Sequence, residues 1–128
     1  MTSSHPAEAR DAMSFRELVA WAWQETAPAH RNRANLLIHL FAVPLFVAGH
    51  AMLLEAFISS WRWALLAPAC IVASLVLQKI GHSLERQPPH PFTGLRDFVR
   101  RFYAEQFCNF WRYLFSGQWY ASFTSPVR

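Results

Sequence analysis

The sequence predicts an all-α protein whose centre is an integral membrane helical hairpin of two kinked spans, with amphipathic interfacial helices on either side. Hydrophobic residues make up 53% of the 128 residues and charged residues only 16%, against about 25% charged residues in a typical soluble domain. Between Arg33 and Lys79 the only formally charged residues are Glu55 and Arg62. This interval divides into two apolar runs, each long enough to match the roughly 20 residues that cross a bilayer.

The chain before the hairpin is predicted to hold a disordered tail and one short helix. Residues 1–13 are polar and lack the basic start and apolar core of a signal peptide. Ser14 and Glu17 form a capping-box pattern, and apolar residues then recur on one helical face around Leu18. This pattern predicts a helix that lies in the membrane interface. The length suits one domain, so residues 1–128 are expected to form a single membrane domain.

Two membrane spans are expected, over Leu36–Ile58 and Trp61–Ile80, with a turn at residues 59–60. Because the turn is so short, the spans must lie side by side and run antiparallel. Pro44 and Pro68 lie near the middle of the two runs, where a proline removes a backbone donor and kinks a helix. A soluble helical bundle with a very apolar core is the alternative interpretation.

Basic residues flank both ends of the hairpin. Arg31 and Arg33 precede the first span, and Lys79 and Arg86 are the first basic residues at the end of the second. Loops rich in arginine and lysine face the cytoplasm in most membrane proteins. Both termini are therefore expected in the cytoplasm, at a bacterial inner membrane or at the endoplasmic reticulum.

A second amphipathic helix is expected after the hairpin. Residues 95–114 carry apolar side chains at helical spacing, and Asp97, Arg101 and Glu105 form a charged series at intervals of four. Tyrosine and tryptophan rings on this segment favour the headgroup level of a membrane, although an aromatic face packed as ordinary core explains them equally well. Gly117 is expected to end the helix.

The charge balance, the cysteines and the missing motifs exclude several function classes. The net charge of +4 suits anionic headgroups or a carboxylate substrate. Nucleic acid is not expected as a partner, because the basic residues form no continuous block. Cys70 and Cys108 lie in an apolar run and on a predicted helix, so no disulfide is expected. Hydrolase and nucleotide-binding motifs do not occur in the sequence.

Four polar residues are expected to meet near the cytoplasmic end of the hairpin. Counted from the turn, His39 and His82 lie at nearly the same depth, so they can face each other across the two spans. Asn35 and Glu85 lie about one turn further out, on the same helix faces. His50 lies about 16 Å deeper than His39. It is expected instead to form a hydrogen bond to a neighbouring helix.

The same residues predict a metal site. His30 and His90 also match in depth, and either can fold inward as a further ligand. Two imidazoles and a carboxylate suit non-haem Fe(II), which needs open positions for O₂ and substrate. Zinc accepts the same ligands. A polar group without a partner is costly inside a membrane, so the clustering of these residues favours metal binding over chance.

Two short motifs resemble a known family. The first is H-x4-N-x3-H over residues 30–39, followed by Pro44, and the second is Gly81-His82-x-x-Glu85, followed by prolines. In their order and membrane setting they resemble the membrane-embedded 2-hydroxy-fatty-acid dioxygenases of the fungal endoplasmic reticulum and their small bacterial relatives. The resemblance covers roughly residues 25–117. This sequence departs from the pattern at Ala42, where relatives usually carry glycine.

The resemblance implies an Fe(II)-dependent oxidoreductase of fatty-acid α-oxidation, which uses O₂ to shorten a 2-hydroxy fatty acid by one carbon. By motif, His30, His39 and His82 are the expected iron ligands, and Asn35 and Glu85 are the expected catalytic partners beside them. An extra histidine, His90, leaves open whether the ligand set is complete.

The substrate's carboxylate needs a cationic partner. Arg31, Arg33 and Arg86 are the arginines nearest to the cluster in sequence and are the expected substrate-binding residues. Each also suits the simpler role of an anchor at the membrane surface. Two spans are few to enclose a lipid tail, which leaves a homodimer open. The competing function is a non-catalytic membrane protein, either a bis-histidine haem carrier or a packing subunit of a larger complex.

Overall fold

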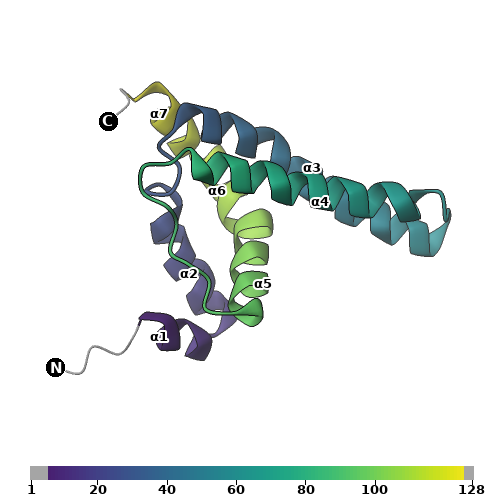
Figure 1. Ribbon diagram of the computed structural model, residues 1–128, viewed down its shortest axis with the longest axis horizontal. Helices are drawn as coiled ribbons and strands as arrows, with labels where there is room; N and C mark the ends of the chain where they lie inside the picture. The colour runs from purple at the N-terminus through teal and green to yellow at the C-terminus, as the bar shows by residue number, and fades with distance from the viewer. Residues whose placement is uncertain (1–5, 126–128) are drawn as a thin grey trace.

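The computed structural model describes residues 6–125, and they form helices joined by turns and loops (Figure 1). No strand occurs within these residues, so the prediction of an all-α fold is confirmed for the described part of the chain. The helices are, in chain order, α1 (Pro6–Ala12), α2 (Phe15–Thr26), α3 (Arg33–Ile58), α4 (Trp63–Ser83), α5 (Leu95–Ala104), the π-helix η1 (Glu105–Asn109), α6 (Phe110–Phe115) and α7 (Gln118–Thr124).

The N-terminal segment departs from the predicted disordered tail over residues 1–13. Residues 6–12 form α1, because the buried guanidinium of Arg10 has a hydrogen-bond partner and an ion-pair partner there. Nη2 of Arg10 donates to the carbonyl oxygen of Pro91 at 2.9 Å and lies 3.4 Å from Oδ2 of Asp97. Residues 1–5, with His5 among them, lie outside the described residues.

α2 begins where the capping-box pattern predicts. The Ser14 hydroxyl accepts a hydrogen bond from the backbone N–H of Glu17, and the Glu17 carboxylate accepts one from the backbone N–H of Ser14. Leu18 and Ala22 are buried on the face that packs toward α5 and η1. The predicted apolar face of this helix is therefore a packed face of the protein.

α3 and α4 form the predicted antiparallel hairpin (Figure 1). α3 begins one turn before the predicted span because the Asn32 side chain caps it, accepting hydrogen bonds from the backbone N–H groups of Ala34 and Asn35. Pro44 lies inside α3 and Pro68 inside α4. Both helices continue through their prolines, and the kinks stay a prediction.

Both hairpin helices are long and apolar enough to cross a membrane, and the described residues leave most of their outer half exposed. Only 33% of the most apolar stretch of α3 and 22% of that of α4 is buried within the protein. The outer half extends well beyond the other helices (Figure 1). Its side chains are large and 61–85% exposed at Leu54, Phe57, Ile58, Trp61 and Leu65.

α2 and α5 form a layer that extends away from the inner half of the hairpin, with α1 at its far end, and η1 and α7 contact α3 (Figure 1). The single helix predicted for residues 95–114 is instead α5, one π-helical turn and α6. In the π-helix the backbone N–H of Phe110 bonds to the carbonyl oxygen of Glu105, five residues earlier. The wider turn lets both Gln106 and Asn109 face the interior, where they are 2% and 1% exposed.

The opposite face of α5 and η1 is exposed and apolar. Leu95, Val99, Tyr103 and Phe107 recur at intervals of four and are 38–78% exposed. Phe110 and other residues of the inner face are buried. The segment therefore has an apolar core face and an apolar outer stripe. The core interpretation holds for the inner face, and contact of the outer stripe with a membrane stays a prediction.

The chain reverses after α6 and packs back onto the hairpin. Gly117 has φ 84°, a left-handed conformation that favours glycine, and it ends the helix as predicted. α7 then lies against the start of α3, where the indole Nε1 of Trp119 donates to the carbonyl oxygen of Leu36 at 3.2 Å. This contact ties the C-terminal end of the described chain to the inner half of the hairpin.

Candidate metal centre

His30 lies in the loop between α2 and α3, and its orientation is set by the end of α2. Its Nδ1 lies 2.6 Å from the carbonyl oxygen of Thr26. A carbonyl oxygen only accepts, so Nδ1 carries the proton and Nε2 keeps a free lone pair. The His30 side chain is 6% exposed. Burial lowers its pKa below the ordinary value, against the hydrogen bond to Thr26 and the charge of Glu85, which raise it. Burial therefore favours the neutral ring, which is the form that binds a metal.

His39 and His82 face each other from the two hairpin helices, as their depths predict. Nδ1 of His39 donates to the carbonyl oxygen of Asn35 at 3.0 Å, which leaves its Nε2 free as well. The two ring centroids are 4.7 Å apart. His82 belongs to the last turn of α4.

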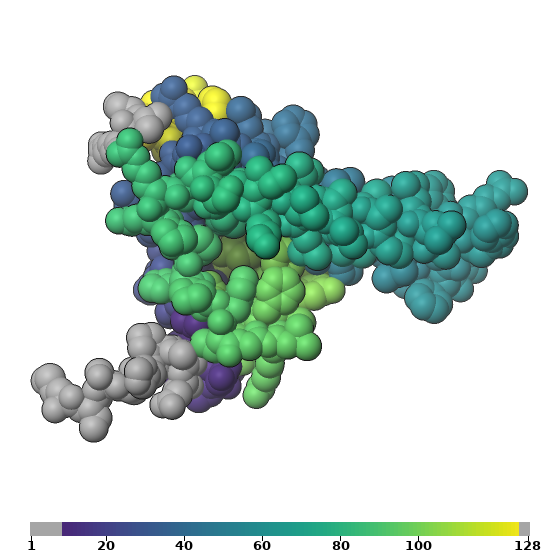
Figure 2. All heavy atoms as spheres, in the orientation of Figure 1, coloured from purple at the N-terminus to yellow at the C-terminus, as the bar shows by residue number. Residues whose placement is uncertain are grey.

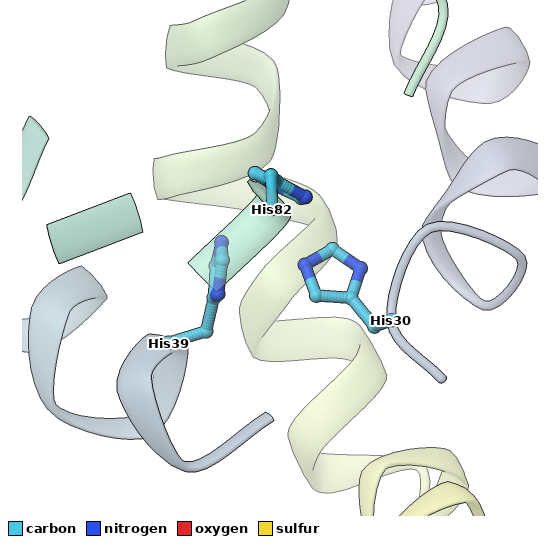
Figure 3. Close-up of side chains that lie close together, drawn as sticks. All are labelled: His30, His39 and His82. Carbon is cyan, nitrogen blue, oxygen red and sulfur yellow. The ribbon is translucent and has the colours of Figure 1, made fainter. Parts of the chain in front are cut away.

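The three imidazoles form one cluster at the inner end of the hairpin (Figure 3). The His30 centroid lies 4.6 Å from that of His39 and 5.1 Å from that of His82. One ring nitrogen from each histidine lies within 4.8 Å of the other two. Figure 3 shows the rings turned toward a common space from a loop, from α3 and from α4.

The cluster has the properties of a metal site. Metal-binding histidines usually donate their second ring N–H to a carbonyl or carboxylate, which fixes the ring, and His30 and His39 both do so. Nδ1 of His82 is buried and has no hydrogen-bond partner among the described residues. A buried polar atom without a partner costs about 1–3 kcal/mol. A cation bound at this cluster would serve His82 in place of a hydrogen-bond partner.

Asn35 and Glu85 lie beside the three histidines and hold the loop that carries His30. The Glu85 carboxylate accepts hydrogen bonds from the backbone N–H groups of Arg31 and Asn32 at 3.0–3.2 Å, and from Nδ2 of Asn35 at 2.7 Å. Nδ2 of Asn35 also donates to the carbonyl oxygen of Ala29 at 3.3 Å. The carboxylate is occupied by these donors, so the structure places it as a partner of the loop and outside the histidine cluster.

The three arginines expected at the substrate lie away from the cavity. Arg31 and Arg86 are exposed. Arg33 donates from Nε to the carbonyl oxygen of Phe123 at 2.9 Å and from Nη2 to that of Ser125 at 3.3 Å. None of the three lines the cavity at the cluster. Nearness in sequence misplaced them, because Arg31 and Arg33 at the start of α3 and Arg86 after α4 are all exposed.

The two other histidines of the hairpin region have partners elsewhere. His90 lies 3.1 Å from Glu25 and 5.9 Å, between ring centroids, from Trp21, so it does not join the cluster. Nε2 of His50 accepts a hydrogen bond from the Tyr103 hydroxyl at 2.7 Å. The prediction that His50 bonds to a neighbouring helix is confirmed.

A cavity of about 450 Å³ adjoins the cluster, between the hairpin and the layer formed by α2, α5 and η1. Its walls are mostly apolar side chains, and Figure 2 shows the surface hollowed between α4 and α5. Charged and amide side chains also line it, namely Glu25, Gln78, Lys79, Arg101, Glu105 and Gln106. Sequence reasoning missed this second set because most of it comes from elements outside the hairpin.

Glu105 is the unusual ionisable group of the cavity. It is half-buried at the start of the π-helix and accepts one hydrogen bond, from the Thr26 hydroxyl at 3.2 Å. Burial raises its pKa to about 7, although the Thr26 hydrogen bond and the charge of Arg101 oppose the shift. Thr26 also accepts the hydrogen bond of His30 through its carbonyl oxygen, so one residue contacts both the cluster and this carboxyl.

The fold and the site together define a helical-hairpin protein with a three-histidine cluster beside an apolar cavity. Comparisons with protein-family models, with curated proteins and with solved structures give no match to the chain. The resemblance to the 2-hydroxy-fatty-acid dioxygenases therefore rests on the two sequence motifs and stays a prediction. Cys70 and Cys108 are both free, so the absence of a disulfide between them is confirmed.

Proposed function

We propose that this chain is an integral membrane, Fe(II)-dependent dioxygenase that shortens a 2-hydroxy fatty acid by one carbon. The observation that carries the proposal is the convergence of three histidine nitrogens at the wall of an apolar cavity. Three imidazoles would hold a metal ion on one side and leave a further position open, as the three histidines of some catalytic zinc sites do. Zinc accepts the same ligands, so the metal itself is part of the test.

Exposure of the hairpin supports membrane insertion. In a soluble bundle the two apolar helices would be mostly buried, whereas most of each span here has no cover from the described residues. Exposed apolar area on this scale is typical of a surface that meets lipid. The basic residues at the inner end support an orientation in which both termini face the cytoplasm.

The proposed orientation can be measured by labelling. Single cysteines at positions 5, 60 and 125, in a background without Cys70 and Cys108, should react with a membrane-impermeant reagent from outside only at position 60. Reaction at the two terminal positions from outside would contradict the orientation. Reaction of all three positions with the outside reagent would contradict insertion.

The chemistry of the substrate suits the cavity. Bound Fe(II) would supply the redox chemistry that reduces O₂. The reaction balances without another reductant, because a 2-hydroxy acid and O₂ yield the shorter acid, CO₂ and water. The apolar walls accept the acyl chain, and a bound metal would be a cationic partner for the 2-hydroxyl oxygen of the substrate. Glu105, with its pKa of about 7, can hold or release a proton at the cavity wall near neutral pH.

A haem carrier is less compatible with the cluster. With iron–nitrogen distances of about 2 Å, imidazoles on opposite faces of one haem iron have ring centroids about 6 Å apart. The three centroids here are 4.6–5.1 Å apart, which suits ligands on the same side of a metal. A Soret band in the purified protein would reverse this preference.

Turnover of defined acids tests the function. Detergent-purified protein, loaded anaerobically with Fe(II), should consume O₂ with 2-hydroxyhexadecanoic acid and yield pentadecanoic acid. Hexadecanoic acid should be inert, because a site that binds the hydroxyl rejects an analogue without it by about 10⁴-fold. Zn(II)-loaded protein is the matched control and should show no turnover. Equal turnover of both acids, or none in protein shown to hold iron, would contradict the proposal.

A further inference from the structure

We propose that Lys79 binds the carboxylate head group of a single-chain amphiphile at the mouth of the cavity. This inference rests on the proposed function, because it assigns the residue that selects the substrate's head group. It replaces the role expected for Arg31, Arg33 and Arg86, which lie outside the cavity.

Two cationic side chains line the cavity, Lys79 and Arg101, and only one is free to take a ligand. Nη1 of Arg101 donates to the carbonyl oxygens of His90 and Pro91 and lies 3.6 Å from Oδ2 of Asp97. Its guanidinium also stacks on aromatic rings on both sides. Lys79 is exposed and has no hydrogen bond or ion pair with the described residues.

The loop between α4 and α5 forms a fixed wall of the cavity. Pro89 and Phe92 of this loop line the cavity. Arg10 and Arg101 both donate to the carbonyl oxygen of Pro91, and His90 is paired with Glu25 on α2. These contacts attach the loop to three other helices, so the loop is a fixed border of the cavity.

The mouth of the cavity lies between α4 and this loop, which leads into α5. Of the side chains that line the cavity, those of Lys79 and Phe92 are exposed, and the others are half-buried or buried. Figure 2 shows the hollow at this place. Next to the mouth, α4 exposes Val76 and Ile80. An ammonium group among apolar side chains fits a ligand with one anionic end and an apolar tail.

The position of Lys79 also fits the cluster. Leu75, Gln78, Lys79 and His82 share the cavity-facing side of α4, because their spacing of three and four residues places them on one face. Lys79 precedes His82 by one helical turn. A carboxylate held by Lys79 therefore brings the adjoining carbon atoms toward the three histidines. The volume of about 450 Å³ suits one acyl chain better than the two chains of a phospholipid.

Binding to the metal-free, full-length protein in detergent tests the assignment without any turnover. The probes are hexadecanoate, the neutral hexadecanol and dihexadecanoyl phosphatidylglycerol, each titrated against tryptophan fluorescence. Lys79→Gln should weaken hexadecanoate binding by about 10- to 100-fold, the usual loss for a charge-assisted hydrogen bond. It should leave hexadecanol binding unchanged. Lys79→Arg should restore hexadecanoate binding to within a few fold.

A matched control separates this role from general electrostatics. Arg96 is an exposed cation at the start of α5 that does not line the cavity. Arg96→Gln removes the same charge and should leave all three affinities unchanged. The proposal is overturned if Lys79→Gln weakens hexadecanoate and hexadecanol equally, or neither, or if wild-type protein does not bind hexadecanoate. Tighter binding of the phosphatidylglycerol, lost in Lys79→Gln, would also overturn it and would make Lys79 a membrane anchor.

Failure of this assignment and failure of the proposed function are distinguishable. Head-group selection is measured without metal, whereas the dioxygenase assay needs iron and O₂. Iron-loaded protein that oxidises 2-hydroxy acids equally well with Lys79→Gln would leave the function intact and remove Lys79 from it.

Discussion

The inner and outer halves of the α3–α4 hairpin differ in which side chains they bury. The inner half buries polar groups, and Asn35, His39, Ser74 and Gln78 are each 4% exposed or less. The outer half exposes apolar groups, with Phe57 85% exposed. The same two helices thus carry polar residues inside and apolar residues outside, which is the reverse of a soluble helical pair.

Two buried polar side chains of the inner half, Ser74 and Gln78, have specific partners. The Ser74 hydroxyl donates to the carbonyl oxygen of Ala42 at 2.5 Å. Gln78 and Gln106 exchange two hydrogen bonds, at 2.9 and 2.8 Å, and so join α4 to the π-helix. Networks of this kind are costly when incomplete and specific when complete. Specific hydrogen bonds therefore fix how the helices of the inner half pack, whereas the outer half contributes exposed apolar surface.

The largest difference between the halves should appear in metal binding. His30→Ala, His39→Ala and His82→Ala should each lower Fe(II) affinity by more than about 100-fold, because each removes one of three ligands. His50 lies further along α3, so His50→Ala should keep the wild-type affinity for Fe(II). Metal content after anaerobic loading and desalting measures this. Equal loss in His50→Ala would show that the cluster is not the site.

Packing should respond differently in the two halves. Leu36 is fully buried in the inner half and Leu65 is 83% exposed in the outer half. Leu36→Ala should lower the free energy of unfolding by about 2–5 kcal/mol. Leu65→Ala should change it by less than about 0.5 kcal/mol. Denaturant unfolding in detergent measures both, and equal losses would mean that the outer half is packed against protein.

Glu105 should make stability depend on pH. Its pKa is raised from 4.5 to about 7 on folding, so the unfolded chain loses its proton first as the pH rises. Protonated Glu105 therefore stabilises the folded state fully below pH 4.5. This contribution to the free energy of unfolding, at most about 3 kcal/mol, is lost progressively up to about pH 7. The lowered pKa of His30 gives a slope of the opposite sign below pH 6.5, and this slope is common to the wild-type protein and Glu105→Gln. The test is therefore the difference between their free energies of unfolding, which should change by about 3 kcal/mol between pH 4.5 and about 7. A difference that does not vary with pH would refute the assignment.

Two glycines offer a smaller and more local test. A Cβ on Gly81 would overlap Oδ1 of Asn35, whereas a Cβ on Gly49 would lie 2.7 Å from Cγ1 of Ile71 and 3.2 Å from the carbonyl oxygen of Ala67, away from the histidine cluster. Gly81→Ala should destabilise by about 1–3 kcal/mol and weaken metal binding by about tenfold, because Asn35 helps to hold the His30 loop. Gly49→Ala should not change metal affinity. Identical metal affinities in the two variants would sharply limit the role of Asn35.

The hairpin and its histidine pair could be predicted because both depend on local rules. Apolar length determined the two helices to within one turn, and the short connection determined that they are antiparallel. Once the turn is placed, residues at equal distance from it lie at equal depth, so His39 and His82 meet. The same count correctly separated His50 from them.

The cavity could not be predicted because it depends on how a separate layer packs on the hairpin. Depth along two helices says nothing about which face α5 presents, so Glu105 and Gln106 were missed as lining residues. The role of Glu85 was also hidden. Its carboxylate satisfies backbone N–H groups that precede α3, and such donors leave no trace in side-chain patterns. The sequence signals a π-helical turn only weakly, because such a turn requires no particular residue type.

The chain order of the three histidines has a consequence for biosynthesis. His82 is the last of them in sequence, and the complete donor set exists once α4 has folded back on α3. The π-helix that forms the opposite wall is synthesised later. A nascent chain that has reached the end of α4 therefore already holds all three imidazoles, while the cavity beside them is still open on one side. A metal ion would have its easiest access during this interval, before the wall that restricts the finished protein has been translated.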